Sequence, residues 1–394
     1  MIKKSKKIHP VKSFAGGKRK SKILFNRVKF PSELRFDLVS KDWVVIATGR
    51  GKRPERFKEE KRKEIKIPKK ICPFCNIKSQ GSPLLIYSNG KKIPLENGIP
   101  KNWSTIGIPN KFPALSPGKL EKKIAEASPH LSPRLASLGL VTEGKFYQKM
   151  NAVGNCELVV TRDHQLHFPH FEIPQVKEVF DVYQERYLDL MEKPLVNYVS
   201  IFHNHGQEAG ASQPHPHSQI VTTPLVDIDL QKALLNSERY FEENPEGKSS
   251  VSYGASKKCI YCEMNDWERR IQKRLVFENE GFLAICPFAS KAAFEVIISP
   301  KFHSPYFERI TDHQKYQLAK IFQIVMKKLY KALNDPPYNF YLHTAPCDKK
   351  DYPYYHWHWT ILPKTAIPAG FEIGTRIEIS TIEPEKAAKY LRKQ

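Results

Sequence analysis

Residues 212–219 read Ser-Gln-Pro-His-Pro-His-Ser-Gln, and residues 356–360 read His-Trp-His-Trp-Thr. Both histidine pairs follow the same series of features: a Cys-x-x-Cys pair, a single histidine, a stretch of helical periodicity and a short strand-like stretch. The single histidines, His164 and His303, precede the first histidine of their pairs by 51 and 53 residues. Such matched intervals between matched residue types indicate an internal duplication.

Apolar periodicity gives each copy a helix followed by a strand. Apolar residues recur every three or four positions over 176–191 and 318–329, which predicts two helices, the second capped by Thr311 or Asp312. Strands are expected at 43–48, 157–161, 197–202, 282–285, 294–298 and 339–342. The pattern predicts an α+β fold of two similar units, each an antiparallel sheet with a long helix packed on it.

The two copies differ in the distance from the cysteine pair to the single histidine, 89 residues in the first and 41 in the second. We therefore expect an insertion in the first copy, a Pro-, Gly- and Ser-rich loop region over residues 76–144. The predicted organisation is a basic tail over 1–30, a first repeat over 31–225 and a second over 226–394.

Composition limits the class of protein. The 394 residues have a mean hydropathy of −0.50, and no apolar stretch reaches the ~18 residues of a membrane span. The basic N-terminus has no apolar segment behind it, so it does not read as a secretory signal. Seven cysteines in such a chain do not suggest a disulfide framework. We expect a soluble, cytoplasmic protein.

The net charge of +23 is concentrated at the N-terminus, where residues 1–30 hold eleven lysines and arginines and no acid. A basic tail can bind nucleic acid, but a solvated extension is the more ordinary interpretation. A moderately basic body also suits phosphorylated substrates.

Paired cysteines and histidines predict metal binding. Thiolates of Cys72 and Cys75, with imidazoles of His164 and His215, can complete a tetrahedral zinc site. A redox role for the cysteine pair is disfavoured, because redox pairs open a helix within a βαβ unit.

The second copy offers the same ligand set in the same order: Cys259, Cys262, His303 and His356. This repetition predicts a second zinc ion. The spacing of about twelve residues between Cys and His pairs, typical of classical zinc fingers, is absent, which disfavours sequence reading of DNA.

Only one histidine of the pair is needed as a zinc ligand, so the other imidazole can take part in a reaction. Residues two apart on a strand share a face, so His215, His217 and Gln219 project together. While His215 holds zinc, His217 can act as a nucleophile near neutral pH, and Gln219 can orient a phosphate. A hydrogen-bonded core histidine is the alternative, weakened by three aligned polar side chains.

The stretch 202–219 resembles the active site of galactose-1-phosphate uridylyltransferases, a nucleotidyltransferase branch of the histidine-triad superfamily. The resemblance extends from about residue 35 to residue 391 and implies duplicated histidine-triad-like units. Residues 35–54 look like the family's nucleotide-binding opening, with Arg50 and Arg53. Residues 110–115, beginning at Asn110, look like its base- and ribose-contacting loop.

This resemblance implies a ping-pong reaction in which His217 takes UMP from UDP-glucose and passes it to galactose 1-phosphate. Ser212 and Gln219 match positions that contact phosphate, and Asn204 matches one that supports the nucleotide. The first Cys/His set matches the family's zinc ligands. Relatives are usually homodimers, which we expect here as well.

Several residues depart from the family pattern and leave the base and the hexose open. Ser218 stands where the best-known enzymes have glycine, and Leu230 and Gln231 stand near an expected metal-binding glutamate. The second Cys-x-x-Cys resembles a two-zinc branch that includes ADP-glucose phosphorylase. Arg376 falls about where a hexose-binding glutamate is expected.

Three alternatives follow. An adenylyltransferase or ADP-glucose phosphorylase would use the same histidine chemistry. A hydrolase is disfavoured, because hydrolases of the superfamily carry a longer histidine string where this chain has Gln219. A zinc-stabilised nucleic-acid-binding protein is the alternative from another class.

The second copy is expected to be structural. His358 is followed by Trp359 and Thr360, with no glutamine two residues on to orient a phosphate. Trp357 and Trp359 should point to the opposite face of the strand and pack in the core.

Overall fold

The computed structural model describes residues 32–48, 67–118, 138–244 and 259–394. All of these residues belong to one compact unit, Ser32–Gln394. The basic tail predicted over residues 1–30 lies outside the described residues.

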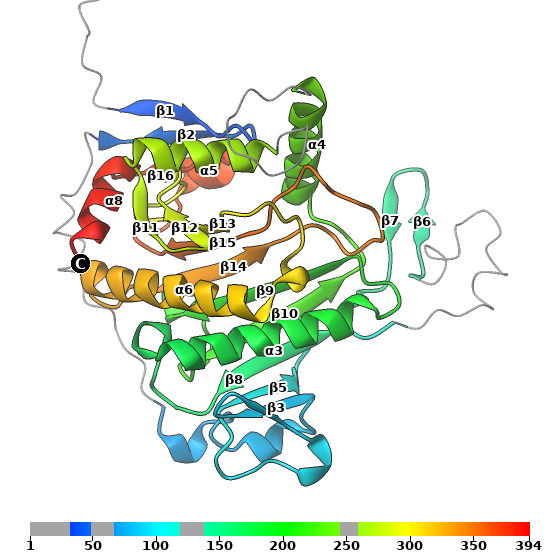
Figure 1. The fold of residues 1–394 in the computed structure, drawn as a ribbon. Coiled ribbons are helices and arrows are strands. Elements are labelled where there is room, and N and C mark those ends of the chain that lie inside the picture. Colours follow the sequence, from blue (N-terminus) through cyan, green and yellow to red (C-terminus); the bar gives the residue numbers. More distant parts are fainter. Residues whose placement is uncertain (1–31, 49–66, 119–137, 245–258) are drawn as a thin grey trace, which may run out of the picture. The chain divides into compact units, whose positions relative to one another are not determined.

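Eleven of the described strands form one antiparallel sheet with the first repeat at one side and the second at the other (Figure 1). In spatial order the strands are β11 (Leu275–Glu278), β12 (Phe282–Ile285), β13 (Val296–Pro300), β15 (His358–Pro363), β14 (Tyr338–His343), β9 (Tyr198–His205), β10 (His217–Thr223), β8 (Cys156–Thr161), β5 (Thr105–Pro109), β3 (Leu85–Ser88) and β4 (Lys91–Ile93). Outward from its centre, β9-β10-β8-β5 on one side mirrors β14-β15-β13-β12 on the other, as a duplication requires.

The two half-sheets meet edge to edge at β9 and β14, where Asn204 pairs with Asn339. The predicted α+β class and antiparallel pairing are confirmed, but two separate sheets were expected and one continuous sheet is found. An exposed edge strand leaves a row of N–H and C=O groups unpaired. Joining the halves satisfies both inner edges at once.

Two long helices, α3 (Ile173–Met191) and α6 (Asp312–Leu333), lie side by side across one face of this sheet (Figure 1). Their apolar stripes, which the periodicity predicted, are buried against the sheet in the main core. Thr311 caps α6: its hydroxyl accepts from the Gln314 N–H, and the Gln314 side chain accepts from the Thr311 N–H. This decides between the two caps that the sequence allowed.

Strand β13 begins at Val296, later than expected from the sequence. Phe294, the expected first residue, has a φ of 64° and belongs to a turn, although its side chain is buried. Its apolar character therefore reflects core packing and not an extended backbone.

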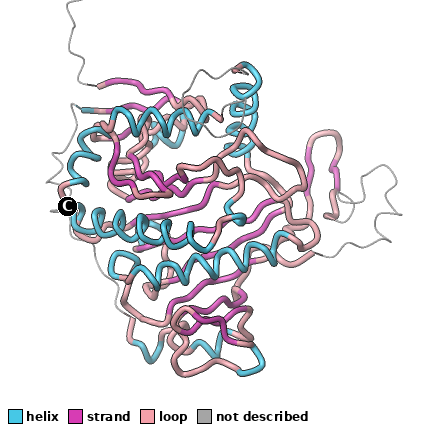
Figure 2. The backbone as a smooth tube through the Cα atoms, viewed as in Figure 1, coloured by secondary structure: helices cyan, strands magenta, loops and turns pink. Residues whose placement is uncertain are grey.

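The prediction that residues 76–144 form a loop insertion is wrong in its described part. This region contributes β3, β4 and β5, which extend the sheet beyond β8 (Figure 2). Apolar side chains of these strands are buried in a separate cluster that also contains Trp103. Short strands separated by turn residues carry too little periodicity to be recognised before their partner is known.

The opposite face of the second half of the sheet is covered by shorter elements. They are α4 (Ile228–Glu243), α5 (Ile260–Ile271) and a small sheet of β1 (Glu33–Phe36), β2 (Trp43–Ile46) and β16 (Ile379–Ser380). The remaining elements are the hairpin β6 (Val141–Glu143) and β7 (Tyr147–Lys149), α7 (Gly370–Thr375) and α8 (Pro384–Arg392). Arg35 of β1 forms a bidentate ion pair with Glu385 of α8 at 3.0 Å. Within the described residues, no helix has the length and apolar character needed to span a membrane.

Candidate active site

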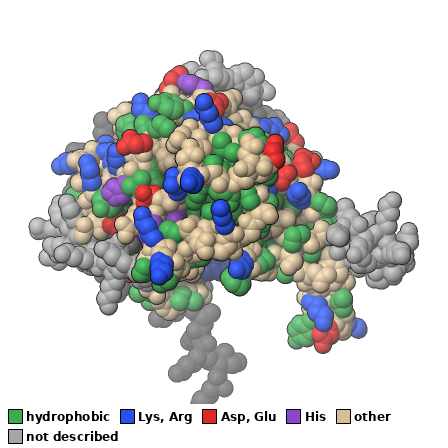
Figure 3. Space-filling view, turned by 90° about the horizontal axis from the view of Figure 1, so that it is seen from below, with side chains coloured by type: hydrophobic (Ala, Val, Ile, Leu, Met, Phe, Trp, Pro, Cys, Tyr) green, Lys and Arg blue, Asp and Glu red, His purple; other side chains and the backbone are tan. Residues whose placement is uncertain are grey.

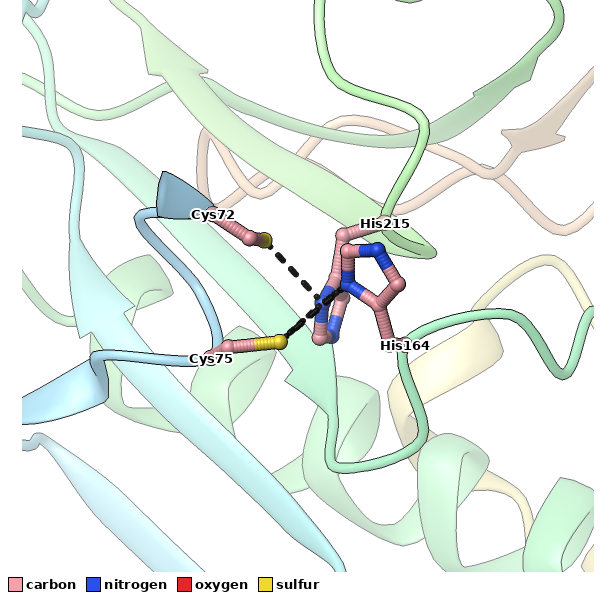
Figure 4. Close-up of side chains that lie close together, drawn as sticks. All are labelled: Cys72, Cys75, His164 and His215. Carbon is pink, nitrogen blue, oxygen red and sulfur yellow. Dashed lines mark hydrogen bonds between the residues drawn. The ribbon is translucent and has the colours of Figure 1, made fainter. Parts of the chain in front are cut away.

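The structure brings the four predicted ligands of the first repeat together at one end of β8 and β10 (Figure 4). Cys75 Sγ lies 3.1 Å from His164 Nδ1, and Cys72 Sγ lies 3.5 Å from His215 Nδ1. The two Nδ1 atoms are 3.2 Å apart. In a tetrahedral zinc site, neighbouring N and S ligands are about 3.3–3.8 Å apart, so the donor atoms match one ion.

Hydrogen bonds on the far side of both imidazoles orient this cluster. His164 Nε2 donates to the Ile67 carbonyl at 2.7 Å, and His215 Nε2 donates to the Thr161 carbonyl at 2.8 Å. With Nε2 protonated, the Nδ1 lone pairs point toward the thiols, as metal ligation requires. Burial lowers the pKa of His215 to about 4, which keeps the ring neutral.

The second repeat holds an equivalent cluster of Cys259, Cys262, His303 and His356. Cys262 Sγ lies 3.5 Å from the Nδ1 atoms of both His303 and His356. His356 Nε2 donates to the Pro300 carbonyl at 3.0 Å, so this ring is oriented like that of His215. The donor set and its hydrogen-bonded support again fit zinc.

His217, the first residue of β10, is separate from the metal cluster but adjoins it. Its Nδ1 donates to the His215 carbonyl at 2.9 Å, which leaves the Nε2 lone pair without a hydrogen bond to any described residue. The Phe74 ring, between the two cysteines, lies 4.9 Å from the His217 ring. Burial lowers the pKa of His217, so its ring is neutral at neutral pH.

The residues around His217 follow from the alternation of β10 and from strand pairing. Gln219 shares the His217 face, and Ser218 opposes His203 of β9, which places Asn204 next to His217. The Asn204 Oδ1 accepts from Asn339 Nδ2 at 2.8 Å. Ser212 is exposed in the loop that precedes His215.

Asn110 lies farther from His217, just beyond β5. Its backbone N–H donates to the Cys156 carbonyl, whereas His217 pairs with Val160 four residues along β8. The Asn110 Oδ1 accepts from the Phe112 N–H at 3.0 Å, which leaves the amide NH2 and the second lone pair of Oδ1 available to a ligand. Arg50 and Arg53 lie outside the described residues.

Sequence reasoning missed two features of this site. Phe74 contacts His217, and the available signal was the aromatic residue at the third position of both Cys-x-x-Cys segments, Phe74 and Tyr261. Behind β10, Tyr183 donates to Ser218 at 2.5 Å, and Ser218 lies 3.1 Å from His203 Nδ1. No local pattern marks this second feature, because its members come from three elements.

The second repeat keeps the first repeat's histidine geometry but has no counterpart of Gln219. His358 Nδ1 donates to the His356 carbonyl at 3.2 Å, as His217 does to His215. Thr360 stands in the place of Gln219. Trp357 and Trp359 are fully buried on the opposite strand face, which confirms the prediction that they pack in the core.

Comparison with known protein families identifies the family to which this chain belongs. The family model for the N-terminal domain of galactose-1-phosphate uridyl transferase matches residues 23–227. The chain belongs to the galactose-1-phosphate uridylyltransferase family. The resemblance seen in the sequence is thereby confirmed, and with it the prediction of an enzyme of the nucleotidyltransferase class.

Individual relatives match along almost the whole chain. ADP-glucose phosphorylase of Arabidopsis thaliana is 28% identical over 91% of this chain and 92% of the relative. Galactose-1-phosphate uridylyltransferase of Thermotoga maritima is 27% identical over 91% of this chain and 98% of the relative. The crystal structure of the Arabidopsis phosphorylase with bound ADP-glucose superposes with a TM-score of 0.69 at 26% identity, covering 92% of this chain and 99% of that one.

Proposed function

We propose that the chain moves UMP from UDP-glucose to galactose 1-phosphate, or to a similar hexose 1-phosphate, through a covalent uridylyl-His217. One observation carries the proposal. The Nδ1 of His217 is held by the His215 carbonyl, so its Nε2 is an oriented, neutral nucleophile that no metal ligand set includes.

In the first half-reaction, the Nε2 lone pair attacks the α-phosphorus of UDP-glucose. The bond from that phosphorus to the oxygen bridging the two phosphates breaks, and its electron pair leaves with glucose 1-phosphate. In the second, a phosphate oxygen of the hexose 1-phosphate attacks the same phosphorus. The P–N bond then breaks and returns its electron pair to Nε2, so both halves balance without a further reactant.

The neighbouring polar groups would hold the phosphates during these steps. Gln219 shares the strand face of His217, and Asn204 lies beside it on β9. Ser212 would reach the phosphates from the preceding loop. Arg50, Arg53 and Asn110 are proposed for the rest of the nucleotide.

Zinc at the Cys72, Cys75, His164 and His215 cluster would tie two other segments to the start of β10, supplying a fixed frame for the nucleophile. The second cluster would hold a second zinc ion with a structural role. In both clusters, the support for zinc is the donor set together with hydrogen bonds that orient the histidines.

ADP-glucose is the second candidate substrate, with inorganic phosphate as the acceptor of the nucleotide. The second Cys/His cluster and Arg376 favour this branch of the family, as does the likeness to the Arabidopsis phosphorylase along nearly the whole chain. The histidine chemistry is the same for both substrates.

Separate incubations with UDP-glucose and ADP-glucose, followed by intact-mass measurement, test both candidates. We expect one adduct with the mass of a single UMP or AMP residue. His217→Ala should form none while keeping its metal content, and the matched variant His358→Ala should still form it. Turnover by His217→Ala, or a nucleotide mapped to His358, would contradict the assignment.

The face seen in Figure 3 carries no nucleic-acid-binding pattern among its described residues. On the face seen in Figure 3, lysine and arginine side chains are scattered among acidic and apolar ones, and the described residues of this face form no continuous basic stripe. A nucleoside diphosphate sugar and a sugar 1-phosphate are the proposed partners. The repeat boundaries at 31–225 and 226–394, the homodimer and the cytoplasmic location stay predictions.

A further inference from the structure

A cavity of about 980 Å³ lies over the second half of the main sheet. Its floor is formed by side chains that point away from α3 and α6, among them Tyr341, His343 and His358, and its walls come from α4, α5 and residues 36–40. This volume is that of a site for a small molecule. His217 and Gln219 do not line the cavity, whereas Asn204, which lies beside His217 on β9, does, so the cavity is centred on the second repeat and adjoins the surroundings of His217.

The internal duplication gives this cavity the aromatic framework of the first site. Tyr261 lies 5.6 Å from His358 between ring centroids, as Phe74 lies 4.9 Å from His217. His343 opposes His358 across the strand pair, in the position that Asn204 occupies beside His217. The second copy thus keeps the contacts that surround the nucleophile in the first.

The second copy also adds a stacked pair that the first lacks. The His343 and His358 rings are stacked at 4.6 Å with an interplanar angle of 27°. The His343 ring nitrogens make no hydrogen bond to the described residues. Together with Tyr341, whose ring lies 5.0 Å from that of His343, these rings form a surface for stacking of a flat ring with polar edges.

The charge of the described part of the cavity lining disfavours a phosphate as the recognised group. The described lining residues carry more acids than bases: Asp37, Asp227, Asp229, Glu263, Glu268 and Glu295 against Arg274, Lys291 and Lys364. Arg274 is paired with Glu268 at 2.6 Å, and Lys291 lies 3.7 Å from Asp42, so two of the three cations already have partners. Thr360 supplies no amide where Gln219 stands in the first repeat.

We propose that this cavity is a second ligand site that binds an uncharged nucleoside or nucleobase. Such a ligand offers a flat heteroaromatic ring to stack on His343 and Tyr341, and base N–H groups, in the ring or on an exocyclic amine, that can donate hydrogen bonds to the carboxylates of the lining. It carries no phosphate for these acids to repel. The site goes beyond the proposed function, since the second repeat would bind and the first would react.

Calorimetric titration of the full chain with adenosine and with uridine tests the proposal and identifies the base. We expect at least one nucleoside to bind at a site that His343→Leu weakens about tenfold or more, because the variant keeps apolar volume but removes the ring. The matched variant Gln219→Thr, which gives the first repeat the residue of the second, should leave this binding within about twofold. Tyr341→Leu is the second variant if His343→Leu does not fold.

Three results would overturn the proposal: wild-type nucleoside affinity in both folded variants, equal affinity of this site for the 5′-monophosphates, or a change of oligomeric state in His343→Leu. The last would mean that another copy of the chain covers the cavity. Adduct formation at His217, measured in the same samples, separates the two proposals. His343→Leu should retain it, and His217→Ala should lose it while still binding the nucleoside.

Discussion

The hydroxyl of Ser218 is the centre of a buried polar chain on the face of β10 opposite to His217. Tyr183 and His203 are about fully buried, and both depend on Ser218 for a hydrogen bond. Burial raises the pKa of Tyr183, so its phenol stays a hydrogen-bond donor across the neutral range. His203 Nε2 has no hydrogen-bond partner among the described residues, so this ring depends on the Ser218 hydroxyl at Nδ1 for its hydrogen bond.

Removing the Ser218 hydroxyl should lower the free energy of unfolding more than removing the Tyr183 hydroxyl that donates to it. Ser218→Ala leaves two buried groups, Tyr183 Oη and His203 Nδ1, without partners, and each costs about 1–3 kcal/mol, for about 2–6 kcal/mol in all. Tyr183→Phe removes one hydrogen bond and leaves Ser218 bonded to His203, at about 0.5–1.5 kcal/mol. The double variant leaves only His203 without a partner and should therefore be more stable than Ser218→Ala alone.

Urea unfolding followed by circular dichroism, with zinc content matched between samples, gives the free energy of unfolding of each variant. The expected order of stability is wild type, Tyr183→Phe, the double variant and then Ser218→Ala. Ser212→Ala, at an exposed serine of the neighbouring loop, is the control and should stay within about 0.5 kcal/mol of wild type. Additive losses in the double variant would refute the reasoning, because they would show that Tyr183 is not left unsatisfied.

Three further predictions concern the metal clusters and the buried acid of the cavity. His215→Ala should lose zinc from the first cluster and a large part of the protein's stability, measurable as metal content and melting temperature; unchanged zinc would exclude His215 as a ligand. Cys259→Ser should lower bound metal and melting temperature but leave turnover per folded molecule nearly unchanged, and a parallel loss of turnover would contradict a structural role. Burial raises the pKa of Glu295 from 4.5 to about 7, so its contribution to stability is complete below pH 4.5 and is lost as pH rises through 7. Glu295→Gln should remove a fall of up to about 3 kcal/mol from the pH profile of unfolding, and an unchanged profile would assign that fall to another group.

The sequence alone determined which side chains could meet. Ligand sets repeated at matched spacing indicated two Cys/His clusters, and the structure places the donor atoms of each within 4.8 Å of one another. Alternation along β10 indicated that His217 and Gln219 share a face while Trp357 and Trp359 turn inward in the other copy. These inferences succeed because they depend on strand and turn geometry, which repeats every few residues.

Only the tertiary structure decided how the two copies join and what surrounds their histidines. Asn204 and Asn339, 135 residues apart, pair at the centre of one continuous sheet. The same assembly turns residues 76–144 in part into strands, buries Ser218 between Tyr183 and His203, and forms a cavity over the second repeat that residues of the first repeat also line. Strand pairing and burial depend on which distant segments lie next to one another, and that is settled by the packing of the whole chain and by no local pattern.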